Sequence, residues 1–446
     1  MQDPFDTTTA APDRPPNVFH LDLESAVVSK LTWRLVPFLF LLYIVAYLDR
    51  INVGFAALQM QQDLHFNDAI YGAGAGMFFW GYLTLQVPSN LMLQRVGAKR
   101  WIAILMMVWG AVSSAMIFVS TPRSFYILRF LLGAAEAGFF PGVILYLKTW
   151  FPASARARTV ARFMTAGPLS GVVGSPVSGL LLNLHHRLGL AGWQWLFLLE
   201  GLPAILLGGV VLVYLTNRPE DADWLSEEQR RWLLDTLRQE EHVAVAARGS
   251  DVRSALLSLR TWMLVVLYFG LTMASYGISM FLPKLIHSVS VASNTLIGLL
   301  SAIPYVAAAV AMVLVGLHSD RTGERRWHAA VPAFAGALAL GVAAYSNSVT
   351  PLIAGISVAL LGVFSIMGPF WAMPTSFLSG TAAAVGIALI NSIGNLGGYF
   401  GPRIIGQVRN ATGQYRGGLL VIGTAMAISG VMAMLMKYEH REVITT

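Results

Sequence analysis

The sequence contains roughly twelve apolar stretches, each close to the length that a helix needs to cross a lipid bilayer, which is about 20 residues. Only 12 % of the residues are charged, about half the usual fraction of a soluble protein. We therefore expect an all-α integral membrane protein, which excludes a disordered chain, a nucleic-acid-binding domain and almost any soluble enzyme. The expected spans are residues 33–53, 70–94, 101–120, 124–149, 158–183, 193–216, 261–286, 294–318, 327–346, 350–375, 382–406 and 417–437.

The distribution of basic residues predicts the orientation, because cytoplasmic loops carry an excess of Lys and Arg. With both termini placed inside, the inner loops and tails hold 22 of the 30 basic residues. The outer loops hold five, which are Arg123, Arg187, Lys284, Arg409 and Arg416. The sequence therefore predicts a multi-pass protein with both termini in the cytoplasm.

The spans divide the chain into two halves, two tails and a linker. Residues 1–30 are the N-terminal tail, 31–216 the first six-helix half, 217–260 the linker, 261–437 the second six-helix half and 438–446 the C-terminal tail. In the linker, residues 226–241 begin with a helix N-cap and acidic residues and carry an apolar stripe, which predicts an amphipathic helix on the inner surface. We interpret it as a connecting helix; a regulatory docking site is the alternative.

The two halves repeat one another. Residues 95–100 (RVGAKR) recur as residues 321–326 (RTGERR), an offset of 226. Gly171 and Pro176 recur at the same offset as Gly397 and Pro402. Duplicated halves around a site at the membrane midplane are a known transporter architecture.

Several kinds of chemistry have no signal in this sequence. There is no cysteine, which removes disulfides, thiolate metal sites and cysteine nucleophiles. His185 and His186 are adjacent but have no supporting ligands, and no Gly-rich phosphate loop is present. We therefore expect no metal, no cofactor and no enzymatic activity.

Several motifs resemble those of known transporters. Residues 316–326 (GLHSDRTGERR) resemble the loop signature of the major facilitator superfamily, although the first-half copy has Asn90 at its Gly position and Gln94 at its Asp position. Residues 167–179 resemble the Gly/Pro motif of that superfamily's fifth span. The resemblance covers essentially the whole chain and implies the major facilitator fold, with twelve transmembrane helices in two pseudo-symmetric halves.

A narrower resemblance rests on three further segments. Residues 47–52 (YLDRIN), 129–142 (RFLLGAAEAGFFPG) and 193–201 (WQWLFLLEG) together resemble the anion:cation symporter family, in particular its bacterial tartrate, phthalate and sugar-acid carriers. The resemblance implies proton coupling at Asp49 and Glu136, substrate binding at Arg50, and substrate contacts at Tyr47 and Tyr82. It also implies a location in the bacterial inner membrane.

The charged residues inside the spans are independent candidates, because a charge at bilayer depth is costly and usually functional. They are Asp49, Arg50, Arg129, Glu136 and Glu200, all in the first half. This asymmetry suggests that the first half handles charge while the second half supplies polar and aromatic walls.

The fourth span carries two of these charges. Arg129, Gly133 and Glu136 share one helix face, with Glu136 about 10 Å deeper than Arg129. We interpret Glu136 as a proton carrier; the alternative is that it only closes an ion pair with Arg129 or another helix.

The first span carries two adjacent charges. Asp49 and Arg50 point about 100° apart, so each needs its own partner. We expect Asp49 to pair with Arg129, which makes Arg129 part of the proton-coupling group and leaves Arg50 free to face the cavity and bind a substrate carboxylate. The alternative for Arg50 is a position at the outer headgroups.

The remaining candidates are uncharged, apart from Glu200. We expect Tyr82 to be a hydroxyl donor or an interfacial tyrosine, and Glu200 to make a structural hydrogen bond to a neighbouring helix. In the second half, Trp371, Asn391 and Asn395 are candidate substrate contacts, and the two amides share a helix face. The alternative for the amides is that they only hold helices together.

Together these features predict a secondary transporter that imports a small organic acid anion by proton symport through alternating access. We expect a tartrate-like hydroxydicarboxylate or a sugar acid as substrate. Protons and the lipid bilayer are the other expected partners, nucleic acid is not one, and we expect a monomer. Two alternatives stay open: an efflux antiporter of the same fold, and an organic-acid sensor that does not transport.

Overall fold

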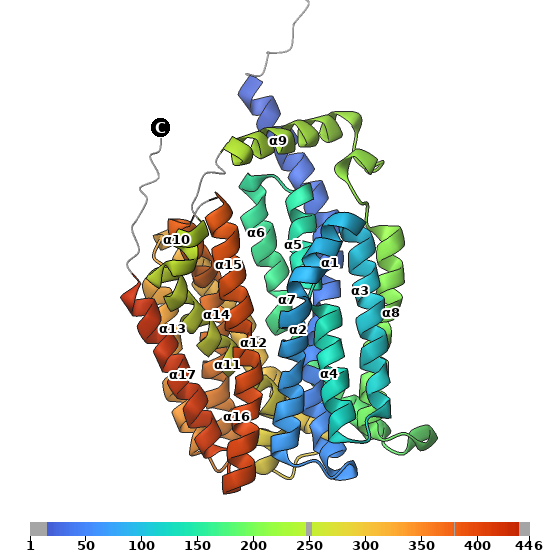
Figure 1. Cartoon of the computed structure of the whole chain (residues 1–446), viewed down its shortest axis with the longest axis vertical. Helices are drawn as coiled ribbons and strands as arrows, with labels where there is room; N and C mark the ends of the chain where they lie inside the picture. Colours follow the sequence, from blue (N-terminus) through green and yellow to red (C-terminus); the bar gives the residue numbers. More distant parts are fainter. Residues whose placement is uncertain (1–15, 247–251, 379, 437–446) are drawn as a thin grey trace, which may run out of the picture.

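The structure is a computed structural model that describes residues 16–246, 252–378 and 380–436 (Figure 1). These residues form α-helices and short 3-10 turns, and no strand is found among them. Each predicted span falls on one helical segment or on consecutive ones, although α1 extends well beyond the first span, 33–53, at both ends. The helices are α1 (Pro16–Asp63), α2 (Asp68–Val96), α3 (Ala98–Ala115), α4 (Pro122–Glu136), α5 (Phe139–Trp150), α6 (Ala153–Met164), α7 (Ala166–Leu181), α8 (Gly192–Tyr214), α9 (Glu227–Ala246), α10 (Val252–Leu257), α11 (Leu259–Ser288), α12 (Asn294–Thr322), α13 (Arg326–Ala344), α14 (Val349–Phe377), α15 (Gly380–Asn395), α16 (Gly397–Thr412) and α17 (Arg416–Leu435).

Ten helical segments of the described chain are long and apolar enough to cross a membrane. The two expected spans outside this set are α2 and the pair α15–α16. Helix α2 is rich in Gly, aromatic and amide residues, which lowers its hydropathy. Both elements nevertheless run through the same bundle as the other ten (Figure 1).

The helices form two bundles, α1–α8 and α11–α17, which lie side by side in Figure 1. The sequence repeat corresponds to a structural one. Gly97 ends α2 with φ of 88°, and Gly323, 226 residues later, ends α12 with φ of 67°. Glycine adopts a positive φ without strain, so the repeated motif places a glycine of positive φ at the end of the second helix of each half. The ψ angles differ, 150° at Gly97 and 0° at Gly323, so the chain leaves the two helices in different directions.

The two halves approach closely at the end of the bundle opposite α9. A Cβ on Gly72 of α2 would lie 2.3 Å from the Pro402 carbonyl oxygen of α16. A Cβ on Gly298 of α12 would lie 2.6 Å from the Ser175 carbonyl oxygen of α7. Gly72 and Gly298 are again 226 residues apart, so two related helix crossings close this end by backbone contact.

Charges reinforce the contact between the halves at this end. The Lys284 ammonium of α11 bonds Asp68 of α2 and Gln61 of α1. Arg409 of α16 lies 3.9 Å from the same Asp68 carboxylate. The prediction that Lys284 lies in an outer loop is therefore wrong: Lys284 lies inside helix α11, within the expected span 261–286, and its side chain is largely buried.

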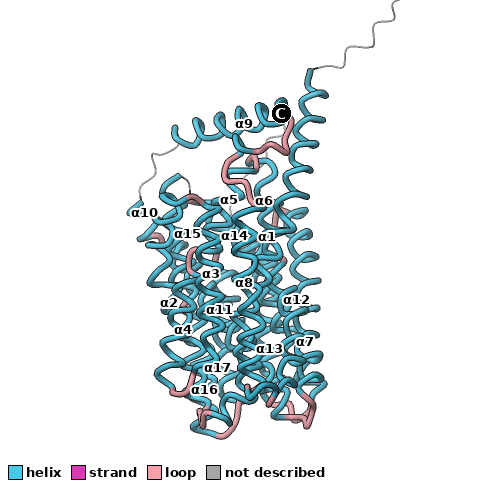
Figure 2. Tube along the Cα trace, turned by 90° about the vertical axis from the view of Figure 1, so that its right-hand side faces the viewer, coloured by secondary structure: helices cyan, strands magenta, loops and turns pink. Residues whose placement is uncertain are grey.

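Helix α9 crosses the opposite end of the bundle, where α1 begins (Figures 1 and 2). It covers the predicted amphipathic run, and the Ser226 hydroxyl accepts from the Gln229 amide as expected of an N-cap. Glu240 binds it to the first half through the Ala153 amide (2.6 Å) and the Arg156 guanidinium (2.9 Å).

The predicted terminal tails lie partly or wholly outside the described residues. From Pro16 onward, the segment predicted as an N-terminal tail is helical and continuous with the first span. The predicted tail 438–446 lies outside the described residues.

Candidate functional site

A cavity of about 100 Å³ lies between the two halves. All six residues predicted to bind substrate line it: Tyr47, Arg50, Tyr82, Trp371, Asn391 and Asn395. The remaining lining comes from α1, α5–α7, α11, α12 and α14. The cavity therefore combines side chains from both halves, as a site that changes access when the halves move would require.

Arg50 is the cation of this cavity. Its Nε donates to Glu136 Oε1 at 2.6 Å, and its Nη1 donates to the Tyr276 hydroxyl at 3.2 Å. Its Nη2 is buried and bonds to no residue that the structure describes. The guanidinium also lies 5.4 Å from the Phe78 ring and 5.3 Å from the Tyr82 ring, within reach of cation–π attraction. Arg50 is only 7 % exposed, so it is not at the outer headgroups.

Glu136 reaches Arg50 because the fourth span breaks at this point. Helix α4 ends at Glu136 and α5 begins at Phe139. Three residues earlier, a Cβ on Gly133 would lie 1.8 Å from the Phe78 carbonyl oxygen, so only glycine lets α4 lie this close to α2. Glu136 is fully buried, and its Oε2 has no bonding partner among the described residues.

The expected ion pair between Asp49 and Arg129 does not form. Arg129 instead donates to two main-chain carbonyls, those of Asp49 at 3.5 Å and Ala75 at 3.2 Å. The Asp49 carboxylate turns toward α3, where Ser113 donates to its Oδ1 at 2.6 Å, and its Oδ2 has no partner in the described part of the chain. Both side chains are fully buried, and the ion pair of the site is Arg50–Glu136.

The second-half wall of the cavity is polar and uncharged. Asn395 Nδ2 donates to the Asn391 carbonyl oxygen at 2.8 Å and to its Oδ1 at 3.0 Å, so the two amides share a face as predicted. Trp371 packs against Tyr268, with ring centroids 5.2 Å apart. These side chains offer hydrogen bonds and aromatic surface without adding charge.

Sequence reasoning missed part of the lining. Tyr43, Tyr268, Thr272, Ser275 and Tyr276 line the cavity but are not among the predicted substrate contacts. Helical spacing could have pointed to most of them, because one shares a face with a predicted residue and three share a face of α11 with one another. Tyr43 precedes Tyr47 by four residues, and Tyr268, Thr272 and Ser275 are spaced by four and three along α11.

Two other polar residues have structural contacts. Ser178 of α7 donates to Glu200 Oε1 of α8 at 2.7 Å, which is the hydrogen bond between helices that we expected for Glu200. Ser392 of α15 donates to Gln86 of α2 at 3.1 Å and so links the two halves. Neither Glu200 nor Gln86 lines the cavity.

No group of three or more His, Cys, Asp or Glu side chains that could hold a metal ion occurs within the described ranges. The arrangement is instead suited to binding an anion. One guanidinium, several hydroxyls and two amides converge on a small enclosed space, and a guanidinium matches a carboxylate in geometry and charge.

Comparison with known sequences relates the chain to transporters. Residues 39–402 match the profile of the Major Facilitator Superfamily. A protein of Agrobacterium vitis named as a candidate tartrate transporter is 48 % identical over 428 residues, which are 95 % of this chain and 94 % of that protein. A quinolone resistance transporter of Acinetobacter baumannii is 38 % identical over 427 residues, which are 95 % of this chain and 98 % of that protein.

A solved structure shows the same fold. It is a bacterial homologue of the human lysosomal transporter Spinster in an inward-facing, occupied conformation, with a TM-score of 0.73 and 16 % identity. The alignment covers 90 % of this chain and 95 % of that one. The twelve-helix, two-half architecture predicted from the sequence is thereby confirmed. This chain therefore belongs to the major facilitator superfamily, and it is a multi-pass membrane transport protein, not an enzyme.

Proposed function

We propose that this chain carries a small carboxylate anion across the membrane together with protons. The observation that carries the proposal is the buried ion pair between Arg50 and Glu136 at the wall of the cavity. The same guanidinium is the partner of Glu136 and the cation of the cavity. A substrate carboxylate that binds Arg50 therefore competes with Glu136 for it.

This competition couples substrate binding to protonation. Leaving Glu136 charged and unpaired in the interior would be costly. A proton on Glu136 removes that charge and frees the guanidinium, which then binds the substrate carboxylate through parallel hydrogen bonds. When the substrate leaves, Glu136 releases its proton and the ion pair re-forms. Movement of the two halves around the cavity carries substrate and proton together.

Asp49 is the second proton site in this proposal. Its carboxylate is buried, it is bonded to the Ser113 hydroxyl and not to a cation, and a buried carboxylate of this kind is a functional candidate by default. The two carboxylates and the two guanidiniums of Arg50 and Arg129 balance in charge when the cavity is empty. Protons on Asp49 and Glu136 would keep the site neutral when a dianion enters.

A small hydroxydicarboxylate of the tartrate type fits this site best. Pockets for drug-sized ligands are about 300–1,000 Å³, and the cavity of about 100 Å³ is well below that. The hydroxyl and amide groups of the second half suit the hydroxyls of such a substrate. The name of the Agrobacterium vitis relative supports the same class.

The proposed cycle is import across the bacterial inner membrane, with α9 and both termini on the cytoplasmic side. The excess of basic residues at the α9 end supports this orientation. The close backbone contacts at Gly72 and Gly298 then lie at the outer end.

The decisive experiment is uptake of labelled tartrate into proteoliposomes under an imposed inward proton gradient. We expect accumulation above equilibrium that a protonophore abolishes. Uptake that never exceeds equilibrium would contradict proton coupling, and binding without uptake would favour the sensor alternative.

Glu136→Gln separates binding from coupling. This variant mimics the protonated acid, so we expect it to exchange tartrate across the membrane but to lose accumulation driven by the proton gradient. Glu200→Gln is the matched control, because Glu200 is a buried carboxylate outside the cavity, and it should accumulate tartrate normally. If Glu136→Gln also accumulates tartrate normally, the role assigned to Glu136 is wrong.

The relative from Acinetobacter baumannii keeps drug efflux as a second candidate function. Against it stands the Arg50 guanidinium in the cavity, which repels cationic drugs. Efflux of a quinolone from cells that express the chain, together with no tartrate uptake, would favour this candidate.

A further inference from the structure

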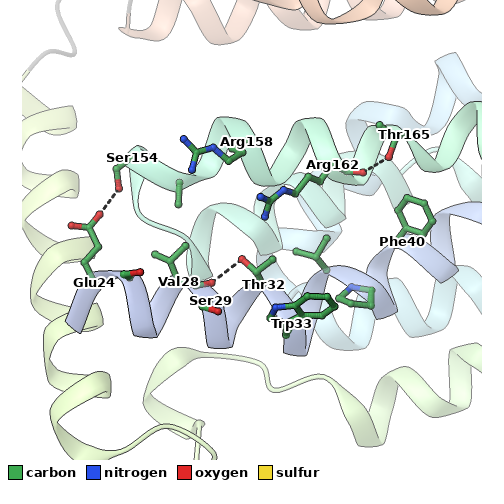
Figure 3. Close-up of a pocket in the computed structure, with 14 residues that line it drawn as sticks. Glu24, Val28, Ser29, Thr32, Trp33, Phe40, Ser154, Arg158, Arg162 and Thr165 are labelled. Atoms are coloured by element: carbon green, nitrogen blue, oxygen red, sulfur yellow. Dashed lines mark hydrogen bonds between the residues drawn. The ribbon is translucent and has the colours of Figure 1, made fainter. Parts of the chain in front are cut away.

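A large groove opens at the α9 end of the first half, separate from the central cavity. It has a volume of about 920 Å³ and lies between the N-terminal part of α1 and helix α6 (Figure 3). Its lining includes the apolar residues Val36, Pro37 and Phe40 and the hydroxyls of Ser25, Ser29, Thr32, Ser154 and Thr165.

Two arginines project from α6 into this groove. Arg158 and Arg162 are one helical turn apart, about 6 Å along the axis, and Figure 3 shows Arg162 extending toward α1. Both are exposed, and neither forms an ion pair with a residue that the structure describes. Arg156 of the same helix is different, because Glu240 neutralises it at 2.9 Å.

The groove contains one acid. Glu24 lines its outermost part and accepts a hydrogen bond from Ser154 at 2.9 Å (Figure 3). Glu24 lies at the opposite end of the groove from Phe40, four turns away along α1. The positive charge of Arg158 and Arg162 is therefore not cancelled by a bonded carboxylate.

The groove leads toward the central cavity along both helices. On α1, Val36 and Phe40 line the groove, and the next residues on the same face, Tyr43 and Tyr47, line the cavity. On the other wall, Thr165 lines the groove, while its neighbours Met164 and Gly167 line the cavity. Tyr43 packs against Phe140 at the junction, with ring centroids 5.8 Å apart.

From this geometry we infer that Arg158 and Arg162 form a second, weaker site for the carboxylate of the transported anion, on the path between the central cavity and the α9 end. The inference rests on the proposed function. The site holds the anion by charge-assisted hydrogen bonds from exposed guanidiniums, so its affinity is modest and falls with salt. An anion leaving Arg50 would meet this site before reaching bulk water.

The absence of cysteine from the chain makes a direct test possible. A single cysteine in place of Ser25, at the groove mouth, carries an environment-sensitive fluorophore in the full-length protein. Sodium tartrate and inorganic phosphate are titrated separately at constant ionic strength. We compare the otherwise unchanged chain with Arg158→Gln/Arg162→Gln, with Arg50→Gln, and with Arg218→Gln, a control for an exposed arginine at the same end but outside the groove.

We expect tartrate to shift the fluorescence in the unchanged chain, in Arg50→Gln and in Arg218→Gln at similar concentrations. In the double variant the midpoint should rise by up to about fivefold for each arginine lost, the range for exposed ion pairs. A response that persists unchanged in the double variant would overturn the inference, and so would a response that disappears in Arg50→Gln protein that is still folded under the conditions of the titration. If transport fails but the groove still binds tartrate, the proposed function is wrong and the groove site stands.

A lipid phosphate could bind the same two guanidiniums, so the source of the anion is tested separately. The titration is repeated in nanodiscs made with phosphatidylcholine alone or with added phosphatidylglycerol. An unchanged tartrate midpoint supports a site for the transported anion. Loss of the tartrate response in the anionic discs would overturn that assignment in favour of a lipid headgroup.

A transport measurement tests the same inference independently. In proteoliposomes of known orientation, the double variant should raise the half-saturating tartrate concentration from the α9 side and leave that from the opposite side unchanged. An equal rise from both sides would contradict a site on only one path.

Discussion

The two halves of this transporter share a fold but differ in how their helices handle charge. The first half buries Asp49, Arg50, Arg129 and Glu136 at or beside the cavity, whereas the second half lines it with tyrosines, amides and Trp371. The repeat therefore preserves helix crossings, such as those at Gly72 and Gly298, while the side chains at the centre differ between the halves. Both halves supply helices around the cavity, whereas the buried charged residues of the site are concentrated in the first half.

Removing a first-half charge should have the largest effect. Arg50→Gln leaves Glu136 buried without its cation, and breaking such a pair costs about 3–5 kcal/mol. We expect a large loss of stability against unfolding in detergent and no tartrate uptake. Arg403→Gln is the second-half control: it removes a cation of α16 that bonds the Tyr399 hydroxyl and does not line the cavity, and it should change both measurements little.

The double variant Arg50→Gln/Glu136→Gln removes both charges of the ion pair, so that the first-half wall of the cavity becomes uncharged like the second-half wall. We expect it to regain most of the lost stability, because no unpaired charge is left, but no uptake. A double variant as unstable as Arg50→Gln would mean that pairing with Glu136 is not what Arg50 contributes to the fold.

The two related helix crossings between the halves, at Gly72 and at Gly298, should respond similarly to an added methyl group. In Gly72→Ala and Gly298→Ala the new methyl group meets a backbone carbonyl at 2.3 and 2.6 Å, so the halves must separate at this end, at a cost of about 1–3 kcal/mol. The readout is the reactivity of a single cysteine replacing Ser279, which is buried beside Gly54 in the contact between α1 and α11. Its labelling by a membrane-impermeant thiol reagent should speed up.

Gly341→Ala is the matched control for this experiment. A Cβ at Gly341 meets nothing within 4 Å, so the change should leave cysteine labelling unchanged and can stabilise helix α13 by up to about 1 kcal/mol. Unchanged labelling in both Gly72→Ala and Gly298→Ala would show that these crossings do not hold the end closed.

The second half's own contribution to the site should be smaller. Tyr276→Phe removes the hydroxyl that accepts from Arg50 Nη1 at 3.2 Å, a contact worth about 0.5–1.5 kcal/mol. We expect the half-saturating tartrate concentration to rise roughly two- to tenfold, with the ratio of protons to tartrate unchanged. Tyr305→Phe, a buried tyrosine outside the cavity, should change neither value. A changed ratio in Tyr276→Phe would show that the second half takes part in coupling.

Much of this architecture could be predicted from the sequence because membrane insertion imposes a simple rule. Apolar length gives the spans, and a charge within a span marks a site. Depth along a helix follows from 1.5 Å per residue, which is why Glu136 was expected about 10 Å deeper than Arg129.

The pairing of the charges was not predictable in the same way. Which acid meets which guanidinium depends on the rotation and spacing of helices far apart in the sequence, and on the break after Glu136 that ends α4. A one-dimensional reading assigned Arg129 to the Asp49 carboxylate, whereas Arg129 bonds main-chain carbonyls and Arg50 bonds Glu136. Lys284 was counted among the outer-loop cations although the expected span 261–286 includes it, and the structure shows it inside α11, bonded to Asp68.

The smallest expected effect distinguishes the two copies of the repeated loop. In the second half, Glu324 accepts from the Trp327 amide at 2.7 Å and the His328 amide at 3.2 Å, and so caps α13. The residue 226 positions earlier is Ala98, and α3 begins without a side-chain cap. Although partial burial acts to raise the pKa of Glu324, the hydrogen bonds from Trp327 and His328 outweigh it and hold the pKa below its usual value.

The sign of the pH dependence follows from that lowered pKa. The cap adds stability above the unfolded-state pKa of a glutamate, about 4.3, and loses it as the pH falls through the lower value of the folded state. We therefore expect hydrogen-exchange protection of the Trp327 and His328 amides, corrected for intrinsic rates, to decline in acid, while the first turn of α3 stays unchanged. Glu324→Gln keeps an acceptor oxygen but cannot titrate in this range, so it should remove the dependence. An equal acid response at the start of α3 would mean that a feature common to both loops is responsible, and not the second-half cap.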